Sequence, residues 1–285
     1  MNRRQTFFIA LLSLIFTVGC VIPGFTDGST PAPVSAADPA QLQAMVDGTV
    51  AAAIAQTEQA APEPESMTEN TPEPSATPAP TEPAMTGKSS LAAQSDGTIL
   101  FVDEQAKFQL NVSPGWLPVR INEQEYYDAF SLPVAADAAV QRALMNIKTL
   151  DPNTFRLFIY DLQDGHMING VITSVNFVWD PEGSISLEDD ADIKQAADDL
   201  STAIPNLNVN SYAVSSTVSG IPIGVIISDI PGKTFEGTDV VLFQKQVYMN
   251  LPAGGLVISF TTEQGFKDAT LPFFDTMVET LKIDQ

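Results

Sequence analysis

Residues 98–285 are predicted to form an α+β domain, in which helices pack on the faces of an antiparallel β-sheet. Strand-like segments follow one another across short turns, such as those at Gly220–Pro222 and Pro252–Gly255, and short turns favour antiparallel pairing. Segments with helical spacing of apolar residues are interspersed with these strands, and one closes the chain. Runs of strands with a few helices over them give a sandwich of two or three layers.

The first part of this domain has two strand-like segments, followed by two helical ones. Phe108–Val112 alternates apolar and polar residues, which is typical of a strand with one buried face. Asn122 is a suitable residue to cap a short helix. Farther on, Val140, Leu144 and Ile147 are spaced four and three residues apart, as on one helix face. We expect strands at about 98–102 and 108–112, a turn at 113–116, and helices at about 123–130 and 136–149.

The remainder of the domain contains most of the strands. The breakers Asp151–Asn153 and Asp180–Pro181 enclose two apolar segments, and acidic residues precede the next helix, where they suit the helix dipole. Leu271, Phe274 and Val278 form the core face of the last helix. We expect strands at about 155–160, 169–179, 207–217, 221–229, 239–250 and 256–262, and helices at about 187–203 and 267–281.

An apolar run near the N-terminus ends at Cys20, the single cysteine of the chain. Arg3 and Arg4 precede this run, and the small residue Gly19 comes directly before the cysteine, as in a bacterial lipoprotein signal. Thr17 departs from the leucine that is usual three residues before the cysteine. We expect a signal peptide at 1–19, lipid attachment at Cys20 and an extracytoplasmic location; a plain signal peptide or a single membrane anchor is the alternative.

Residues 20–97 are expected to form a stalk. Residues 20–60 form a tether with one Ala-rich helix at about 39–59, which carries a narrow apolar stripe. The helix is either solvated or self-associating, and in the second case the protein is a structural stalk oligomer. Residues 61–97 are rich in Pro, Glu and Thr and cannot bury enough apolar surface to fold, so we expect a disordered linker there.

The charge of the chain limits its partners. The formal net charge is −22, and loss of residues 1–19 removes Arg3, Arg4 and no acid, which lowers it by two to −24. Nucleic acid and anionic lipid are bound through clustered Lys and Arg, and the sequence has no such cluster. We therefore expect no nucleic-acid partner, and a monomeric folded domain that binds an envelope protein or a small ligand.

The layout resembles the PsbP/Mog1/DcrB-like group. This resemblance implies a PsbP-like sandwich and a mostly non-enzymatic assembly or binding role. The helical stretch at 122–149 is larger than this group has. The stalk and domain together also resemble uncharacterised envelope lipoproteins of the Chloroflexota. The residues that carry the resemblance to the group are Phe108–Trp116, Gly220–Gly224, Gln244–Tyr248 opposite Val257–Thr261, and Phe273–Ile283.

Candidate chemical sites are few. The single histidine, His166, lies in a loop sequence without a nucleophile motif, so we expect it to be exposed and no catalytic residue to be present. Glu188–Asp192 either chelates calcium or begins a helix in solvent, and it lacks the spacing of an EF-hand loop. With one histidine and no second cysteine, a typical zinc site is excluded, and no cofactor motif is present. The aromatic residues that either line a binding face or pack in the core are Trp116, Tyr126, Tyr127 and Trp179.

The sequence therefore predicts a membrane-anchored, non-catalytic binding or assembly module on a flexible stalk. The main alternative is an envelope hydrolase that uses two carboxylates. Such an enzyme would need two facing carboxyl groups about 5–9 Å apart in a deep cleft.

Overall fold

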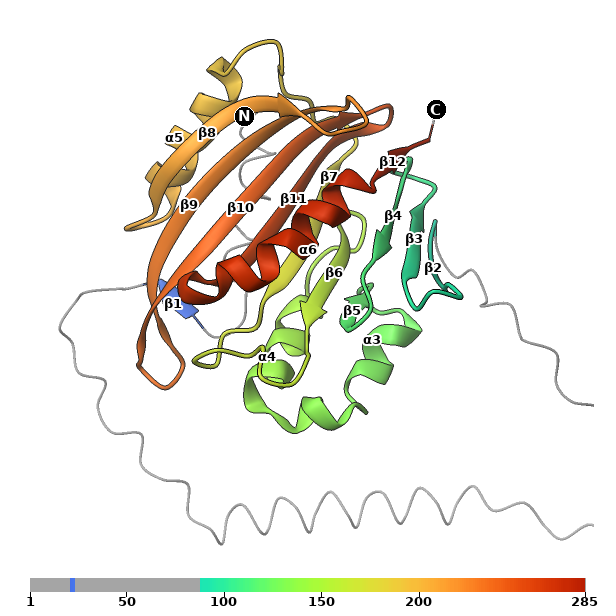
Figure 1. Ribbon diagram of the computed structural model, residues 1–285, viewed down its shortest axis with the longest axis vertical. Coiled ribbons are helices and arrows are strands. Elements are labelled where there is room, and N and C mark those ends of the chain that lie inside the picture. Colours follow the sequence, from blue (N-terminus) through green and yellow to red (C-terminus); the bar gives the residue numbers. More distant parts are fainter. Residues whose placement is uncertain (1–20, 24–87, 285) are drawn as a thin grey trace, which may run out of the picture. The chain divides into compact units, whose positions relative to one another are not determined.

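The structure is a computed structural model that describes residues 21–23 and 88–284 (Figure 1). Cys20, the predicted signal peptide, the predicted helix at 39–59 and most of the predicted linker lie outside the described residues. Within the described part of the chain, no helix is both long and apolar enough to span a bilayer.

The elements of the first half alternate between short strands and short helices. Asp137 caps α4, because its carboxylate accepts a hydrogen bond from the backbone N–H of Ala139 at 2.7 Å. The elements are β1 (Val21–Pro23), β2 (Ser89–Ala93), β3 (Ile99–Asp103), β4 (Phe108–Val112), β5 (Trp116–Val119), α3 (Gln124–Ala129), the 3-10 helix η2 (Pro133–Ala136), α4 (Ala138–Ile147) and β6 (Phe155–Asp161).

The second half contains the long strands. The tight connection between β10 and β11 pairs Leu251 with Gly254, which has a φ of +131° that glycine adopts without strain. The elements are β7 (Ser174–Asp180), α5 (Ala191–Ala203), β8 (Asn208–Ser216), β9 (Pro222–Thr234), β10 (Asp239–Leu251), β11 (Gly254–Glu263), the 3-10 helix η3 (Gln264–Phe266), α6 (Lys267–Glu279) and β12 (Lys282–Ile283).

These strands form two antiparallel sheets. The main sheet has the order β1-β9-β10-β11-β7-β6-β5, and β8 also pairs with β9. The small sheet has the order β12-β4-β3-β2. All the strand pairs are antiparallel, which confirms the predicted α+β fold.

Each face of the main sheet has its own hydrophobic core. On one face the sheet packs against α3, α4 and α5, and this core includes Phe158, Val257 and Leu144. On the other face it packs against α6 and the small sheet, with Phe260, Phe274 and Phe108 among the buried residues. Figure 1 shows α6 crossing the strands of the main sheet. The domain therefore has three layers, with the main sheet in the middle.

The two cores explain why the central strands are apolar on both sides. All seven residues of β6 are buried, because helices cover one face and α6 with the small sheet covers the other. Helix α5 approaches β9 closely at Gly224: a Cβ atom there would lie 2.0 Å from Cδ1 of Ile193. Glycine at this position lets the helix pack directly on the strand backbone.

The structure corrects several element boundaries. The folded region begins before the predicted boundary at residue 98, because β2 pairs with β3 and its Leu91 packs on the apolar core. Asn122 does not cap α3. It has a φ of +62°, and the cap position is Glu123. Helix α5 starts at Ala191 rather than at residue 187, and β7 starts at Ser174 rather than at residue 169.

Besides β1 and β2, two further strands were not expected from the sequence. Trp116 was expected at the exit of a turn, but it begins β5, which pairs with β6 from Trp116↔Asp161 to Val119↔Phe158. Lys282–Ile283 is β12 and pairs with Phe108–Gln109 of β4. Both segments are short, so their partners, rather than an alternating pattern of their own, make them strands.

Candidate functional site

His166 has a partner that its sequence context does not reveal. Its Nδ1 lies 2.7 Å from Oδ2 of Asp161, which is buried, and the imidazole itself is only 30% exposed. The ring also packs edge-on against Phe266, with centroids 5.2 Å apart. The expectation of an exposed loop histidine was therefore wrong, because the turn at Gly165 folds the loop back onto the end of β6. Asp161 orients the imidazole and attaches this loop to the sheet.

The acidic segment Glu188–Asp192 serves backbone groups at the start of α5. The carboxylate of Asp190 accepts from the N–H of Val214 in β8 at 2.6 Å, and that of Asp192 accepts from the N–H of Ser186 at 3.1 Å. Asp189 accepts from the N–H of Ala191 at 2.9 Å. Among the described residues, no group of three or more His, Cys, Asp or Glu side chains is placed to hold a metal ion.

Three of the four aromatic candidates are core residues. Trp116, Tyr126 and Trp179 are each at most 4% exposed, whereas Tyr127 is 53% exposed. Trp179 also donates from Nε1 to the carbonyl of Ala253 at 3.1 Å. These four side chains therefore do not form one aromatic binding face.

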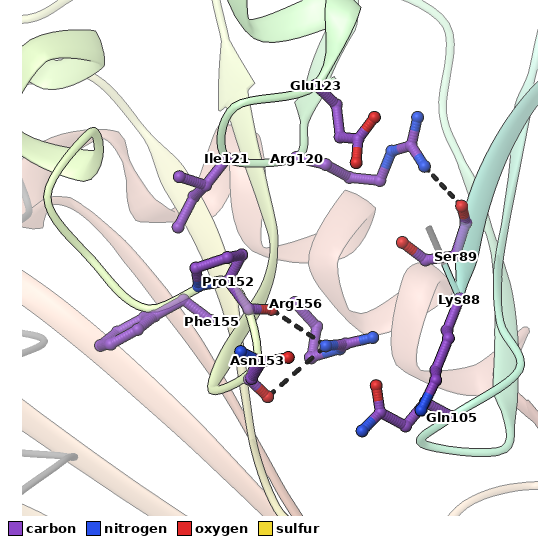
Figure 2. Close-up of a pocket in the computed structure, with 10 residues that line it drawn as sticks. All are labelled: Lys88, Ser89, Gln105, Arg120, Ile121, Glu123, Pro152, Asn153, Phe155 and Arg156. Carbon is purple, nitrogen blue, oxygen red and sulfur yellow. Dashed lines mark hydrogen bonds between the residues drawn. The ribbon is translucent and has the colours of Figure 1, made fainter. Parts of the chain in front are cut away.

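A polar pocket lies where the start of β2 meets the loops after β5 and before β6 (Figure 2). Its volume is about 300 Å³, at the lower end of the range for small-ligand pockets. Basic residues come from three separate segments of the chain. The pocket is lined by Lys88, Ser89, Gln105, Arg120, Ile121, Glu123, Pro152, Asn153, Phe155 and Arg156.

Arg156 is held in a rigid position in this pocket. Its Nε and Nη2 donate to the two carboxylate oxygens of Asp103 in β3, at 2.6 and 3.1 Å, and its Nη1 donates to the carbonyl of Pro152 at 2.9 Å. Arg156 is 7% exposed and Asp103 is fully buried. A register irregularity between Phe155 and Leu157 accompanies this orientation, as bulges commonly redirect a side chain. The ion pair joins the small sheet to the main sheet.

Arg120 is fixed in the same way by a second carboxylate. Its Nε and Nη2 donate to the two oxygens of Glu125 in α3, at 2.5 and 3.1 Å. Its Nη1 donates to the carbonyl of Ser89 in β2 at 2.5 Å, as Figure 2 shows. These contacts use three of the five N–H donors of the guanidinium. Two pre-oriented guanidinium groups therefore border the same pocket.

The pocket gathers basic side chains in an acidic protein, although Arg120 and Arg156 are each paired with a carboxylate and Glu123 also lines it. Three of the thirteen Lys and Arg residues of the chain line it, namely Lys88, Arg120 and Arg156, although the chain carries a net charge of −22. Lys88 is exposed at the rim. Guanidinium and ammonium groups offer only hydrogen-bond donors, so the pocket is suited to an acceptor-rich or anionic group.

The carboxylates expected for a hydrolase are engaged elsewhere. The two acids buried among the described residues, Asp103 and Asp161, lie against Arg156 and His166. A second pocket of about 510 Å³ is lined by both Asp239 and Glu263. Asp239 is 85% exposed and paired with Lys233, and Glu263 accepts from the N–H of Gly265 at the start of η3. Asp239 therefore forms an ion pair between β10 and β9, and Glu263 caps the start of η3.

No protein-family model and no curated protein sequence matches the chain. Among solved structures it is similar to cyanobacterial PsbP of Synechocystis, with 9% identity, a TM-score of 0.38, and coverage of 71% of this chain and 96% of that one. It is similar to the Ran-binding protein Mog1p of Saccharomyces cerevisiae, with 11% identity, a TM-score of 0.34, and coverage of 62% and 90%. It is also similar to a Pseudomonas aeruginosa protein of unknown function, with 12% identity, a TM-score of 0.32, and coverage of 40% and 75%.

PsbP and Mog1 are the proteins to which the sequence layout is also similar. At these identities and TM-scores the likeness concerns the general fold, and it indicates nothing about ligand or partner. The pocket residues were not singled out from the sequence, because Lys88, Arg120 and Arg156 lie far apart along the chain. The scarcity of basic residues is the one sequence signal that bears on them.

Proposed function

We propose that this protein is a membrane-anchored extracytoplasmic lipoprotein whose folded domain is a non-catalytic binding module. Its arginine-lined pocket recognises an acidic group on a partner protein or small ligand. The observation that carries the binding proposal is the pair of pre-oriented guanidinium groups, Arg120 and Arg156, in one pocket of an acidic domain.

The anchor is supported by the N-terminal sequence. A basic start, an apolar run and Gly19 before Cys20 fit a lipoprotein signal, and the Pro-, Glu- and Thr-rich segment after it suits a flexible stalk. A single acyl chain binds a membrane only marginally, so stable anchoring requires two or three chains on Cys20.

The anchor is tested by Cys20→Ser in the full chain. We expect wild type to enter the detergent phase on phase partitioning and the variant to be released or to remain as an unprocessed precursor. Mass spectrometry of the N-terminal peptide identifies the modification directly. A wild-type peptide that retains residues 1–19 and carries no lipid would overturn the lipoprotein proposal.

The binding role is tested by capture from envelope extracts with the full chain. Lys88→Gln removes the exposed charge at the pocket, and Lys148→Gln removes an exposed charge directly after α4 that does not line it. We expect the captured ligand or partner to be lost with Lys88→Gln and retained with Lys148→Gln. Capture should also weaken as salt is raised, since exposed charges are screened. Equal capture by both variants would contradict a role for this pocket.

A further inference from the structure

The strand β8 forms a long, exposed edge of the main sheet, beside α5 (Figure 1). In the described part of the chain it pairs with β9 alone, so its other side has no neighbouring strand. Seven of its nine residues are exposed, and only Val209 and Val214 are partly buried. The other terminal strands of this sheet are shorter, since β1 has three residues and β5 has four, with Pro118 among them.

Two contacts show which backbone groups of β8 point away from β9. The N–H of Val214 donates to the carboxylate of Asp190 at 2.6 Å. Ser216 lies opposite Pro222, which has no N–H and cannot exchange a pair of hydrogen bonds with it. Backbone groups alternate in direction along an antiparallel strand. The N–H and C=O groups of Tyr212, Val214 and Ser216 therefore all point outward.

This outward row is regular enough to pair with another strand. The register irregularity of β8 lies between Val209 and Ser211, and from Ser211 to Ser216 the pairing with β9 is unbroken. No residue of β8 is proline or charged, although natural edge strands commonly use such residues to prevent further pairing. The edge therefore offers backbone donors and acceptors at three successive alternate positions.

The surroundings of this edge are acidic. Residues 188–203, which lead into and form α5, contain six acids and one lysine, and α5 packs against β8. On the neighbouring strand β9, the carboxylate of Asp229 accepts from the side-chain amide of Asn210 in β8 at 2.8 Å. A segment that approaches the edge therefore meets negative charge from the helix and from the sheet.

We propose that the outer edge of β8 is a docking site for an extended, basic segment of a partner protein, which adds to the main sheet as a further strand. Backbone hydrogen bonds hold such a segment, as in other cases of strand addition. At Val214 a carbonyl group of the segment takes the place of the Asp190 carboxylate. This carboxylate is then free to pair with a lysine or arginine of the segment.

The acidic surroundings favour a basic partner over a second copy of this chain. Pairing two β8 strands would bring two copies of residues 188–203 close together, and their like charges repel. None of the residues that line the arginine-containing pocket belongs to β8 or α5. Docking at β8 is therefore independent of binding in that pocket.

The site is tested by adding synthetic peptides of nine residues, the length of β8, to the full chain. A peptide of alternating Lys and Thr should bind at least about tenfold more tightly than one of alternating Glu and Thr, because of charge. It should exceed one of alternating Lys and Pro by a similar factor, because proline disfavours strand pairing. Equal binding of the two Lys peptides would mean that charge alone attracts them, and would overturn the proposal.

Amide hydrogen exchange, followed by NMR, locates the bound peptide. The amides of Tyr212 and Ser216 should exchange more slowly when the peptide of alternating Lys and Thr is bound, because they then donate to it. Binding of this peptide without slower exchange at these two amides would contradict docking at β8.

A proline variant tests the backbone contribution. Tyr212→Pro removes an outward N–H and no hydrogen bond to β9, so it should weaken peptide binding at least about tenfold. Tyr212→Ala, which loses the ring but keeps the N–H, is the control and should bind nearly as wild type does. Equal binding by the two variants would argue against strand addition.

A charge variant gives a second test that does not alter the strand, and it decides alone if melts show that Tyr212→Pro is unfolded. Asp190→Asn keeps an acceptor for Val214 but loses the charge, so it should weaken peptide binding about two- to fivefold. Asp268→Asn removes an exposed acid from the first turn of α6 and should leave binding unchanged. The same affinity for both variants would speak against a basic segment at this edge.

Two other occupants of the edge would give different results. If part of the stalk covers β8, the amides of Tyr212 and Ser216 are already protected before any peptide is added. If a second copy covers it, sedimentation of the full chain shows a dimer that Tyr212→Pro separates. Either result would replace the basic partner with a segment of this chain.

Discussion

The two faces of the main sheet are built from alternate residues of the same strands, yet they differ in kind. On β10, Phe243 and Val247 face α6 and the small sheet, while Gln244 and Gln246 between them face the side of α3, α4 and α5. Both faces are buried. The α6 side is a closely packed apolar core. The other side, here called the polar face, combines an apolar core with buried polar side chains such as Ser174, Gln244 and Thr261. Stability alone explains the first face but not the second, where buried polar groups add a cost.

The largest expected effect distinguishes the faces through two adjacent residues of β11. Phe260 is fully buried and its ring lies 5.2 Å from that of Phe274, so Phe260→Ala should lower the free energy of unfolding by about 3–5 kcal/mol. Thr261→Val on the polar face loses only a 3.4 Å contact with Gln244 and should cost about 1 kcal/mol. Urea unfolding of both variants measures the difference. Equal costs would show that the two faces contribute alike to stability.

The ion pair between the two sheets should matter nearly as much. Arg156→Met leaves the buried carboxylate of Asp103 without its counter-charge and should cost about 3–5 kcal/mol. The control is Lys194→Met on α5, which removes a pair with Asp198 whose side chains are 54% and 57% exposed. Such an exposed pair should contribute little to stability, because water and salt screen it. A small effect of Arg156→Met in urea unfolding would mean that the pair does not hold the sheets together.

The polar face should also be sensitive where a helix touches the strand backbone. Gly224→Ala places a methyl group against Ile193 of α5 and should cost about 1–3 kcal/mol. The double variant Gly224→Ala/Ile193→Val should recover part of this loss, because it shortens the side chain in contact. Thermal melts of the single and double variants test this, and identical melting temperatures would argue against a clash at this position.

Alkaline pH should act on the buried tyrosines of the polar face. Burial raises the pKa of Tyr160 and of Tyr248 above the usual value of 10.0, because the phenolate would be desolvated. Above about pH 10 the unfolded chain loses these protons while the folded one keeps them, so stability is intact below pH 10 and falls as pH rises. Each buried tyrosine should contribute up to about 1.4 kcal/mol per pH unit.

Tyr248→Phe tests this pH dependence. It removes one of the buried tyrosines with a raised pKa and also a 2.9 Å hydrogen bond to Gln246, so it should lower stability at pH 7 and make the alkaline loss shallower. Urea midpoints between pH 8 and pH 11 give the slopes. A slope unchanged from wild type would show that Tyr248 ionises in the folded protein.

Several elements were predictable because their signals are local. The spacing of Leu271, Phe274 and Val278 predicted α6, and the glycines after Pro252 predicted the β10–β11 connection. Alternation in Phe108–Val112 gave β4 with its bounds. The strands β2 and β5 were missed because their own residues show no clear strand pattern. They are strands because they pair with β3 and β6.

The candidate sites depend on contacts between distant parts of the chain. Asp103 and Arg156 are 53 residues apart, and the loop that holds His166 returns to Asp161 only in the folded chain. No local sequence pattern identifies such pairs, because nothing in the sequence distinguishes the acid that will be paired from the others among the 35.

The sequence by itself determined the α+β class, the antiparallel pairing of the long strands and the candidate anchor residue Cys20, which stays a prediction. The tertiary structure decided which polar residues are buried. The alternation of residue types along β10 shows that its two faces differ. The same alternation, with Gln244 and Gln246 on one face, would also be found in a strand whose polar face lies in solvent. What covers a face is set by packing between layers, and packing joins residues that lie far apart in sequence.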